Sequence, residues 1–256
     1  MPFEMEGLAT ATWRKKNSSS DCSRRNMQNS NIELLKNVAK RLGPLLSEVV
    51  FVGGCTTGLF ITDEAAAEVR PTFDVDVIAE ITSYADYDTF SERLRALGFR
   101  EDTSKNAPLC RWLIDTMILD VMPIEERILG FANRWYRSAM DAAQETEFEP
   151  GLRIRVVTAA YFIAIKLEAF RGRGRGDYTT SRDLEDLLAV IDGREAIVEE
   201  IAAAAEIRSY IAEQFRSLLA NQAFNDALPG YLLPDPGSQS RLPILITRII
   251  EIAKLP

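Results

Sequence analysis

The sequence predicts an α+β fold, in which a small mixed β-sheet with flanking helices is followed by a mainly helical C-terminal part. Residues 47–52 and 73–81 are rich in β-branched and apolar side chains and predict two strands. Residues 109–114 and 117–122 form two further apolar runs separated by a dipeptide, which predicts a β-hairpin. By contrast, residues 195–221 are rich in Ala and Leu, which favours packed helices.

The same patterns divide the chain into three regions. Residues 1–30 are polar, rich in Ser and Asn and without sustained periodicity, and they predict a flexible tail. We expect the sheet-containing core at residues 31–128 and the mainly helical region at residues 129–256. Apolar spacing and capping patterns predict further elements, namely helices at residues 31–42, 55–62, 89–97, 159–170, 180–191 and 244–252 and a short edge strand at residues 152–157.

Composition excludes several classes of chemistry. The chain contains no histidine, which removes Ser-His-Asp triads, histidine-ligated zinc and histidine general bases. Its net charge of −8 argues against a protein that coats nucleic acid. The three cysteines show neither metal-ligand nor disulfide spacing, no apolar run approaches the ~20 residues of a membrane helix, and no signal peptide is evident. We therefore expect a cytoplasmic protein without a membrane partner, acting through carboxylates, Lys, Arg, Tyr, Cys or a metal.

Three aspartates are the strongest candidates for a site. Asp74 and Asp76 alternate within the predicted strand 73–81, so both side chains point to one face, and Asp120 ends a second apolar run. Neighbouring carboxylates repel each other and resist burial, and a divalent cation resolves that conflict. Oxygen-only ligation favours Mg2+ or Mn2+ over zinc. The alternatives without a metal site are solvated charges on an exposed strand and, for Asp120, a cap on backbone amides before a turn.

The order of these features resembles the DNA polymerase β-like nucleotidyltransferase superfamily, in which a Gly-Gly or Gly-Ser turn is followed by a helix, an Asp-x-Asp strand and a later Asp. Here Gly53-Gly54 follows the first predicted strand. Further along, Lys166-Leu167-Glu168-Ala169 and Arg182-Asp183-Leu184-Glu185-Asp186-Leu187 are similar to the AbiEii-like branch, which includes toxins of toxin–antitoxin and phage-defence systems. The match runs from about residue 31 to residue 193, and an apparent insertion at residues 63–68 departs from the family pattern.

The resemblance implies a metal-dependent nucleotidyltransferase, which moves a nucleoside monophosphate from a nucleoside triphosphate to an acceptor. It makes Asp74, Asp76 and Asp120 the catalytic metal ligands. It also implies that the C-terminal region completes the nucleotide site, and the nucleotide-binding residues carried over from the turn and from that region are Gly53, Gly54, Thr56, Lys166 and Asp183.

Structural alternatives exist for three of these nucleotide-binding residues. Thr56 could simply cap a helix. Lys166 lies on an apolar helix and could extend its ammonium to solvent instead of meeting a phosphate. Asp183 could be the acid of the capping box Thr180-x-x-Asp183, although Asp186 one turn later would share its face of the helix.

The acceptor and partners are expectations of the same resemblance. Arg171, Arg173 and Arg175 alternate with glycines and form either a solvated linker or a surface for phosphates. We expect an RNA acceptor, in particular tRNA, and a cognate antitoxin protein as partner. Two alternatives are a small-molecule nucleotidyltransferase, such as one that modifies antibiotics, and a non-catalytic binding protein on the same fold.

Overall fold

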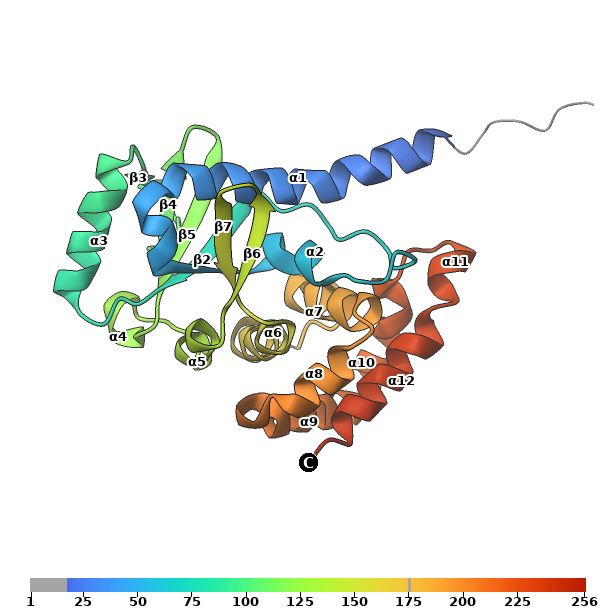
Figure 1. The fold of residues 1–256 in the computed structure, drawn as a ribbon. Helices are drawn as coiled ribbons and strands as arrows, with labels where there is room; N and C mark the ends of the chain where they lie inside the picture. Colours follow the sequence, from blue (N-terminus) through green and yellow to red (C-terminus); the bar gives the residue numbers. More distant parts are fainter. Residues whose placement is uncertain (1–17, 175) are drawn as a thin grey trace, which may run out of the picture.

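The computed structural model describes residues 18–174 and 176–256, and this part of the chain contains a seven-stranded mixed sheet with helices around it (Figure 1). The strands are β1 (Val49–Val52), β2 (Asp74–Ala79), β3 (Arg100–Glu101), β4 (Arg111–Ile114), β5 (Met117–Pro123), β6 (Gln144–Glu149) and β7 (Leu152–Val156). Their order in the sheet is β3-β4-β5-β2-β1-β7-β6. The expected fold class, a mixed sheet followed by a mainly helical part, is confirmed.

Strands β2 and β5 lie at the centre of the sheet and determine where the acidic residues sit. The two strands pair in parallel, with Asp76 opposite Asp120, while β1 pairs with β2 antiparallel, with Val52 opposite Asp76. Val75 and Val77 are fully buried and anchor β2 in the core. Because side chains alternate along a strand, Asp76 points to the opposite face from these two valines.

Helices and short 3-10 turns cover the sheet. Those before β6 are α1 (Ser18–Leu42), η1 (Gly43–Glu48), η2 (Gly54–Thr56), α2 (Thr57–Phe60), α3 (Tyr84–Ala96), α4 (Glu126–Leu129) and α5 (Tyr136–Asp141). Those after β7 are α6 (Ala159–Arg173), α7 (Arg182–Gly193), α8 (Ile197–Ala203), α9 (Ala205–Leu219), α10 (Gln222–Ala227), η3 (Leu228–Tyr231), α11 (Pro236–Gln239) and α12 (Leu242–Ala253). Figure 1 shows this second set as one group beside the sheet, with α6 and α7 nearest to it.

Helix α6 is the centre of the helical group. It is buried from Ala159 to Leu167 and contacts α7, α8 and α9, which explains why its apolar residues show no single face. Lys166 lies within this buried stretch. A charged side chain in such surroundings is stable only with a partner of opposite charge.

Two elements differ from the sequence prediction. The helix expected from residue 89 begins at Tyr84, because Ser83 is the N-cap and its side chain accepts a hydrogen bond from the Asp86 amide. The hydroxyl of Thr89, expected to open the helix, instead donates to Ala85 within it. The strand expected at the edge, residues 152–157, is an inner strand, since β6 pairs with β7 and forms the edge. β6 is mostly polar, so no apolar alternation marked it.

The flexible tail at residues 1–30 stays a prediction. Residues 1–17 lie outside the described residues. Residues 18–30 are helical, because α1 extends further toward the N-terminus than the predicted helix 31–42. Extending an existing helix costs less free energy than nucleating a new one. A polar segment without periodicity can therefore be helical where it directly precedes the packed part of α1. No helix in residues 18–174 and 176–256 is long and apolar enough to cross a membrane.

Candidate active site

The central strands bring the three aspartates together. Asp74 and Asp76 lie two residues apart on β2, and Asp120 is the neighbour of Asp76 on β5. Positions in register on parallel strands share a face of the sheet, so the three carboxylates project from one face. All three line one cavity of about 720 Å3. The expected convergence of these residues is therefore observed.

An arginine that the sequence analysis did not identify binds two of these carboxylates. Arg111 on β4 is the cross-strand neighbour of Asp120, and its Nε and Nη2 donate to the two Asp120 oxygens at 2.9 and 2.7 Å. Its Nη2 also lies 3.4 Å from Asp74 Oδ2. Asp120 is only 6% exposed, so this two-point contact supplies the charge that its burial requires. The hydrogen bonds to Asp120 raise the pKa of Arg111 above its usual range.

The surroundings of Asp76 disfavour its charged form. Burial, followed by the charges of Asp74 and Asp120, raises the pKa of the Asp76 carboxyl to about 7. Within the described residues, the salt bridges of this cluster join Arg111 to Asp74 and Asp120 and leave Asp76 without one. A carboxylate that is desolvated and surrounded by like charges lowers its energy by binding a cation.

The donor chemistry of this cluster fits a hard divalent cation, although the three acids do not form a metal cluster as they stand. Among the residues that the structure describes, no group of three or more Asp, Glu, Cys or His side chains is arranged to hold a metal ion. Asp120 instead uses both oxygens for Arg111. Asp74 and Asp76 are therefore the residues that would hold the ion first, and Asp120 would join them only by exchanging its arginine for the metal.

Glycine is required at both positions of the Gly53-Gly54 turn, because nearby side chains leave no room for a Cβ. Gly53 has a φ of +78°, and a Cβ on it would lie 1.8 Å from Asp76 Oδ2. A Cβ on Gly54 would lie 2.9 Å from Arg70 Nη2 and 3.0 Å from Asp186 Oδ2. Both glycines therefore allow charged side chains to approach the backbone closely. The following helix α2 is a single turn, so its dipole adds little to an anion site here.

Thr56 is not brought into the cavity. Its side chain is fully buried, and its hydroxyl donates to the Gly53 carbonyl at 2.8 Å. This contact stabilises the turn, and the Thr56 side chain makes no capping hydrogen bond to α2, so the helix-cap alternative is not observed either.

Two helices place a chain of alternating charges on another wall of the cavity. Lys166 Nζ on α6 lies 2.6 Å from Asp186 Oδ2 and 3.3 Å from Asp183 Oδ1, both on α7. Asp183 also binds Arg173 through both oxygens, at 2.7 and 2.8 Å, and Asp186 binds Arg70 at 2.9 and 3.0 Å. We call these five residues the ion-pair chain. With three cations and two carboxylates, it has one positive charge in excess.

Lys166 is at the middle of the ion-pair chain and does not extend to solvent, since it is only 6% exposed. Burial alone would lower its pKa, but the carboxylates of Asp186 and Asp183 outweigh burial and raise the pKa of the ammonium above its usual value. Asp183 is not the capping acid of α7, because Ser181 is the N-cap and accepts from the Leu184 amide. Hydrogen bonds from Arg173 and the charge of Lys166 overcome burial and lower the pKa of Asp183.

The cavity thus has carboxylates on one wall and cations on another. Of the residues expected at the site, it is lined by Gly54, Asp74, Asp76, Asp120, Lys166 and Asp183. Gly53 lies behind Asp76. The lining also includes the apolar and aromatic residues Pro108, Met122, Phe131 and Tyr136 and the residues Thr72, Cys110, Arg111, Gly174, Asp177, Ser181 and Arg182.

The Arg/Gly segment differs from the predicted loop. Helix α6 continues through Arg171 and Gly172 to Arg173. Arg173 lines the cavity, whereas Arg171 lies 3.7 Å from Glu168 on its own helix and is not part of the lining. Arg175 lies outside the described residues.

The residues missed by the sequence analysis differ in how far they could have been found. Arg111 follows from the predicted hairpin, because pairing across the Asp115-Thr116 turn places residue 111 opposite residue 120. Arg70 had no local signal, since it lies in the extended segment between α2 and β2 and reaches the site through Asp186. Tyr136 reaches the cavity from α5, a short helix that no pattern predicted.

Comparison with known proteins adds little to this geometry. No protein-family model matches the chain, and no curated protein matches it. Among solved structures, the chain is similar to an antigenic nucleotidyltransferase-like protein from Paracoccidioides brasiliensis, with 15% sequence identity and a TM-score of 0.44, over 73% of this chain and 92% of that chain. So distant a likeness carries no argument about activity. These comparisons do not test membership of the AbiEii-like family, which stays an expectation from the sequence.

Replacing Gly53 by Ala tests the close approach of Asp76 to the turn. We expect Gly53→Ala to lower the free energy of unfolding by roughly 3 kcal/mol, because it combines an unfavourable φ with a steric clash. Gly130→Ala is the control for a positive φ, since Gly130 has a φ of +80° and no atom within 4 Å of an added Cβ, although its ψ of 8° differs from the −175° of Gly53. It should cost about 1 kcal/mol in the same denaturant titration. Equal losses for the two variants would contradict the assigned contact.

Replacing Lys166 by Met tests the ion-pair chain. A lysine that extended to solvent could be replaced at little cost, but here the change leaves two buried carboxylates with one cation each. We expect a loss of about 3 kcal/mol in the free energy of unfolding. The control Lys36→Met breaks a helical surface pair with Glu33 at 3.1 Å and should change stability by less than about 0.5 kcal/mol. Wild-type stability of Lys166→Met would show that the ammonium is not buried between the two acids.

Proposed function

We propose that the chain is a metal-dependent nucleotidyltransferase, which moves a nucleoside monophosphate from a nucleoside triphosphate to an acceptor hydroxyl. The observation that carries the proposal is the separation of charge in the cavity. Asp74, Asp76 and Asp120 lie on the sheet side, while the cations of the ion-pair chain lie on the side of α6 and α7. A triphosphate with its metal has the complementary arrangement of positive and negative charge.

The carboxylate wall supports the metal part of the proposal. Mg2+ or Mn2+ bound at Asp74 and Asp76 would supply Lewis-acid activation of the triphosphate. Burial and the neighbouring charges of Asp74 and Asp120, which raise the pKa of Asp76, support a cation at this carboxylate. Asp120 is positioned beside Asp76 by the register of β5, and Arg111 orients its carboxylate by donating to both oxygens.

The cationic wall supports the phosphate part. Arg173 is accessible, with 73% of its side chain exposed, and Asp183 fixes its guanidinium by two hydrogen bonds. A pre-oriented guanidinium loses little entropy when it binds a phosphate. Lys166 acts here as a positioning residue, because it orients both acids of the ion-pair chain.

The remaining lining suits a nucleobase. Phe131 is 40% exposed and, with Tyr136, offers an aromatic surface to the cavity. Stacking on aromatic side chains binds bases with little preference for sequence. In the proposed reaction the acceptor oxygen attacks the α-phosphorus and its proton passes to Asp120. The bond from the α-phosphorus to the bridging oxygen then breaks, and pyrophosphate leaves toward the cationic wall.

The acceptor in this proposal is an RNA, with tRNA as the expected substrate, and the enzyme acts as a toxin or defence component controlled by a cognate antitoxin. This part rests on the motif resemblance and on Arg173 at the cavity. One observation favours the alternative, a small-molecule acceptor. The net charge is −8, and Arg171 does not reach the cavity, so the surface that could grip an RNA backbone is limited.

Metal-dependent nucleotide binding is the first test. Calorimetric titration of nucleoside triphosphates should show binding with Mg2+ or Mn2+ and a loss of at least about tenfold in affinity for Asp74→Ala/Asp76→Ala. Asp88→Ala, an exposed acid on α3, is the control and should bind as wild type. Equal affinity with and without excess chelator would rule out the carboxylate site.

Transfer to RNA is the second test. The protein is incubated with each labelled nucleoside triphosphate, Mg2+ and total RNA, and we expect label on RNA that disappears in Asp74→Ala/Asp76→Ala. Induced expression should then arrest growth with wild type but not with this double variant. Label found only on small molecules would reject the RNA acceptor and support the small-molecule alternative, while no transfer to any acceptor would support a non-catalytic protein.

A further inference from the structure

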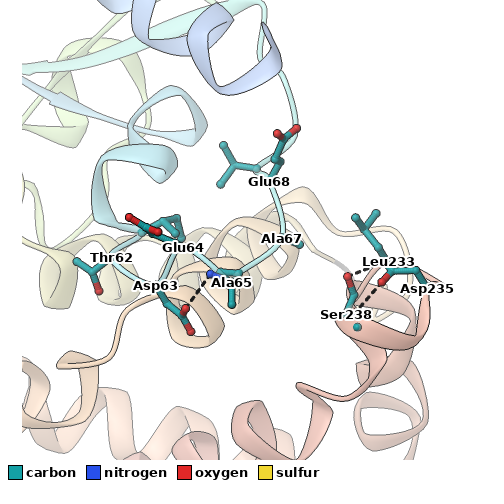
Figure 2. Close-up of a pocket in the computed structure, with 13 residues that line it drawn as sticks. Thr62, Asp63, Glu64, Ala65, Ala67, Glu68, Leu233, Asp235 and Ser238 are labelled. Atoms are coloured by element: carbon teal, nitrogen blue, oxygen red, sulfur yellow. Dashed lines mark hydrogen bonds between the residues drawn. The ribbon is translucent and has the colours of Figure 1, made fainter. Parts of the chain in front are cut away.

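The segment between α2 and β2 has a defined path around the helical part of the molecule. At its start, the amides of Thr62 and Asp63 donate to the Gly193 carbonyl at 2.8 and 2.9 Å, and Asp63 pairs with Arg241 at 2.7 Å. Figure 2 shows the middle of the segment opposite helix α11, which carries Ser238, across a pocket of about 510 Å3. The middle therefore borders open space, and the path of the segment is fixed at its ends.

The far end of the segment is fixed by one buried amide. Asn31 is 1% exposed, and its Nδ2 donates to the Arg70 carbonyl while its Oδ1 accepts from the Thr72 amide, both at 3.0 Å. These two hydrogen bonds hold the backbone on both sides of residue 71. They therefore determine the direction in which the Arg70 side chain leaves the segment.

The Arg70 guanidinium lies over the Gly53-Gly54 turn and lines the cavity of the aspartates. Its Nε and Nη2 donate to the two Asp186 oxygens at 3.0 and 2.9 Å, and Nη2 would be 2.9 Å from a Cβ on Gly54. The side chain is 21% exposed, so part of it faces the cavity. A guanidinium has five N–H donors, and two of them serve Asp186.

The charge of Asp186 is already compensated without Arg70. This buried carboxylate also accepts from Lys166 at 2.6 Å. Arg70 is thus a second cation on one acid. Its Nε also lies 3.4 Å from Glu185 Oε2, but Glu185 does not line the cavity, whereas Arg70 does. A structural salt bridge alone would need one cation for this carboxylate, whereas an anion-binding wall benefits from two.

We propose that Arg70 binds the terminal phosphates of the nucleoside triphosphate, and that the segment between α2 and β2 serves to deliver it. The inference rests on the proposed function and deepens it. Reaction at the α-phosphorus requires that phosphate to lie near Asp76 and Asp120, so the β- and γ-phosphates extend away from the sheet. Arg70 and Arg173, at the two ends of the ion-pair chain, lie on that side of the cavity, together with Lys166 and Arg182.

The experiment compares ligands that differ in their terminal phosphates. The affinities of a nucleoside triphosphate and of the corresponding monophosphate are measured by calorimetry with Mg2+, for wild type and Arg70→Gln. We expect Arg70→Gln to weaken triphosphate binding by about tenfold or more and monophosphate binding by less than about twofold, because only the former has the phosphates that Arg70 contacts. Inorganic tripolyphosphate should follow the triphosphate.

Arg194→Gln is the matched control. Arg194 is 22% exposed, binds both oxygens of Glu200 at 2.6 Å and does not line the cavity, so its loss reproduces the structural effect of removing such a pair. It should leave both affinities unchanged. If Arg70→Gln fails to fold, Arg70→Lys replaces it, with a smaller loss confined to the triphosphate.

The outcomes separate this inference from the proposed function. Equal weakening of triphosphate and monophosphate, unchanged triphosphate affinity in both Arg70 variants, or an equal effect of Arg194→Gln would make Arg70 a structural residue and overturn the inference, with the nucleotidyltransferase intact. Wild-type protein that binds no triphosphate in the presence of Mg2+ would overturn the proposed function, and the inference with it.

Discussion

The repulsion among the carboxylates on β2 and β5 is the constraint on which the site depends. The parallel register fixes Asp76 next to Asp120, and strand alternation adds Asp74 to the same face. Folding therefore brings three acids together in a partly desolvated place, which costs free energy. Arg111 relieves this cost at Asp120 and, at 3.4 Å, at Asp74, and it leaves Asp76 to be compensated by something else.

On the helical side of the cavity, the ion-pair chain compensates buried charges in a similar way. Lys166 shares its ammonium between two acids of α7, and each of these acids also holds an arginine at the cavity. The carboxylates on β2 and β5 and the cations Lys166, Arg173 and Arg70 thus line different sides of one cavity. Such a preorganised field binds a ligand with both a cation and phosphates better than either alone.

How much the sequence predicted depends on whether a signal was local. Three predicted features follow from short-range patterns, and the structure has all three. They are the alternation of Asp74 and Asp76, the hairpin that contains Asp120 and the buried helix around Lys166. The partners of these charges are long-range. Arg70 reaches Asp186 across 116 positions of the chain, and no periodicity encodes such a contact. Thr56 does not line the cavity, because its hydroxyl donates to the Gly53 carbonyl of its own turn.

The segment that departs from the family pattern also illustrates this difference. In the sequence, residues 63–68 form an apparent insertion relative to the family that the chain resembles. In the structure, the segment ends at the backbone that Asn31 fixes, and that backbone carries Arg70. The position of Arg70 therefore depends on where the segment rejoins the sheet. That position is determined by contacts with Asn31, which is distant in sequence.

The most direct measurement of the central claim is a crystal structure of the protein with Mn2+ and a non-hydrolysable nucleoside triphosphate analogue, with the anomalous signal used to locate the metal. The account predicts an anomalous peak bound by Asp74 and Asp76, with the α-phosphate beside it and the terminal phosphates toward Arg70 and Arg173. A metal located away from these carboxylates, or a nucleotide bound outside the cavity, would contradict it.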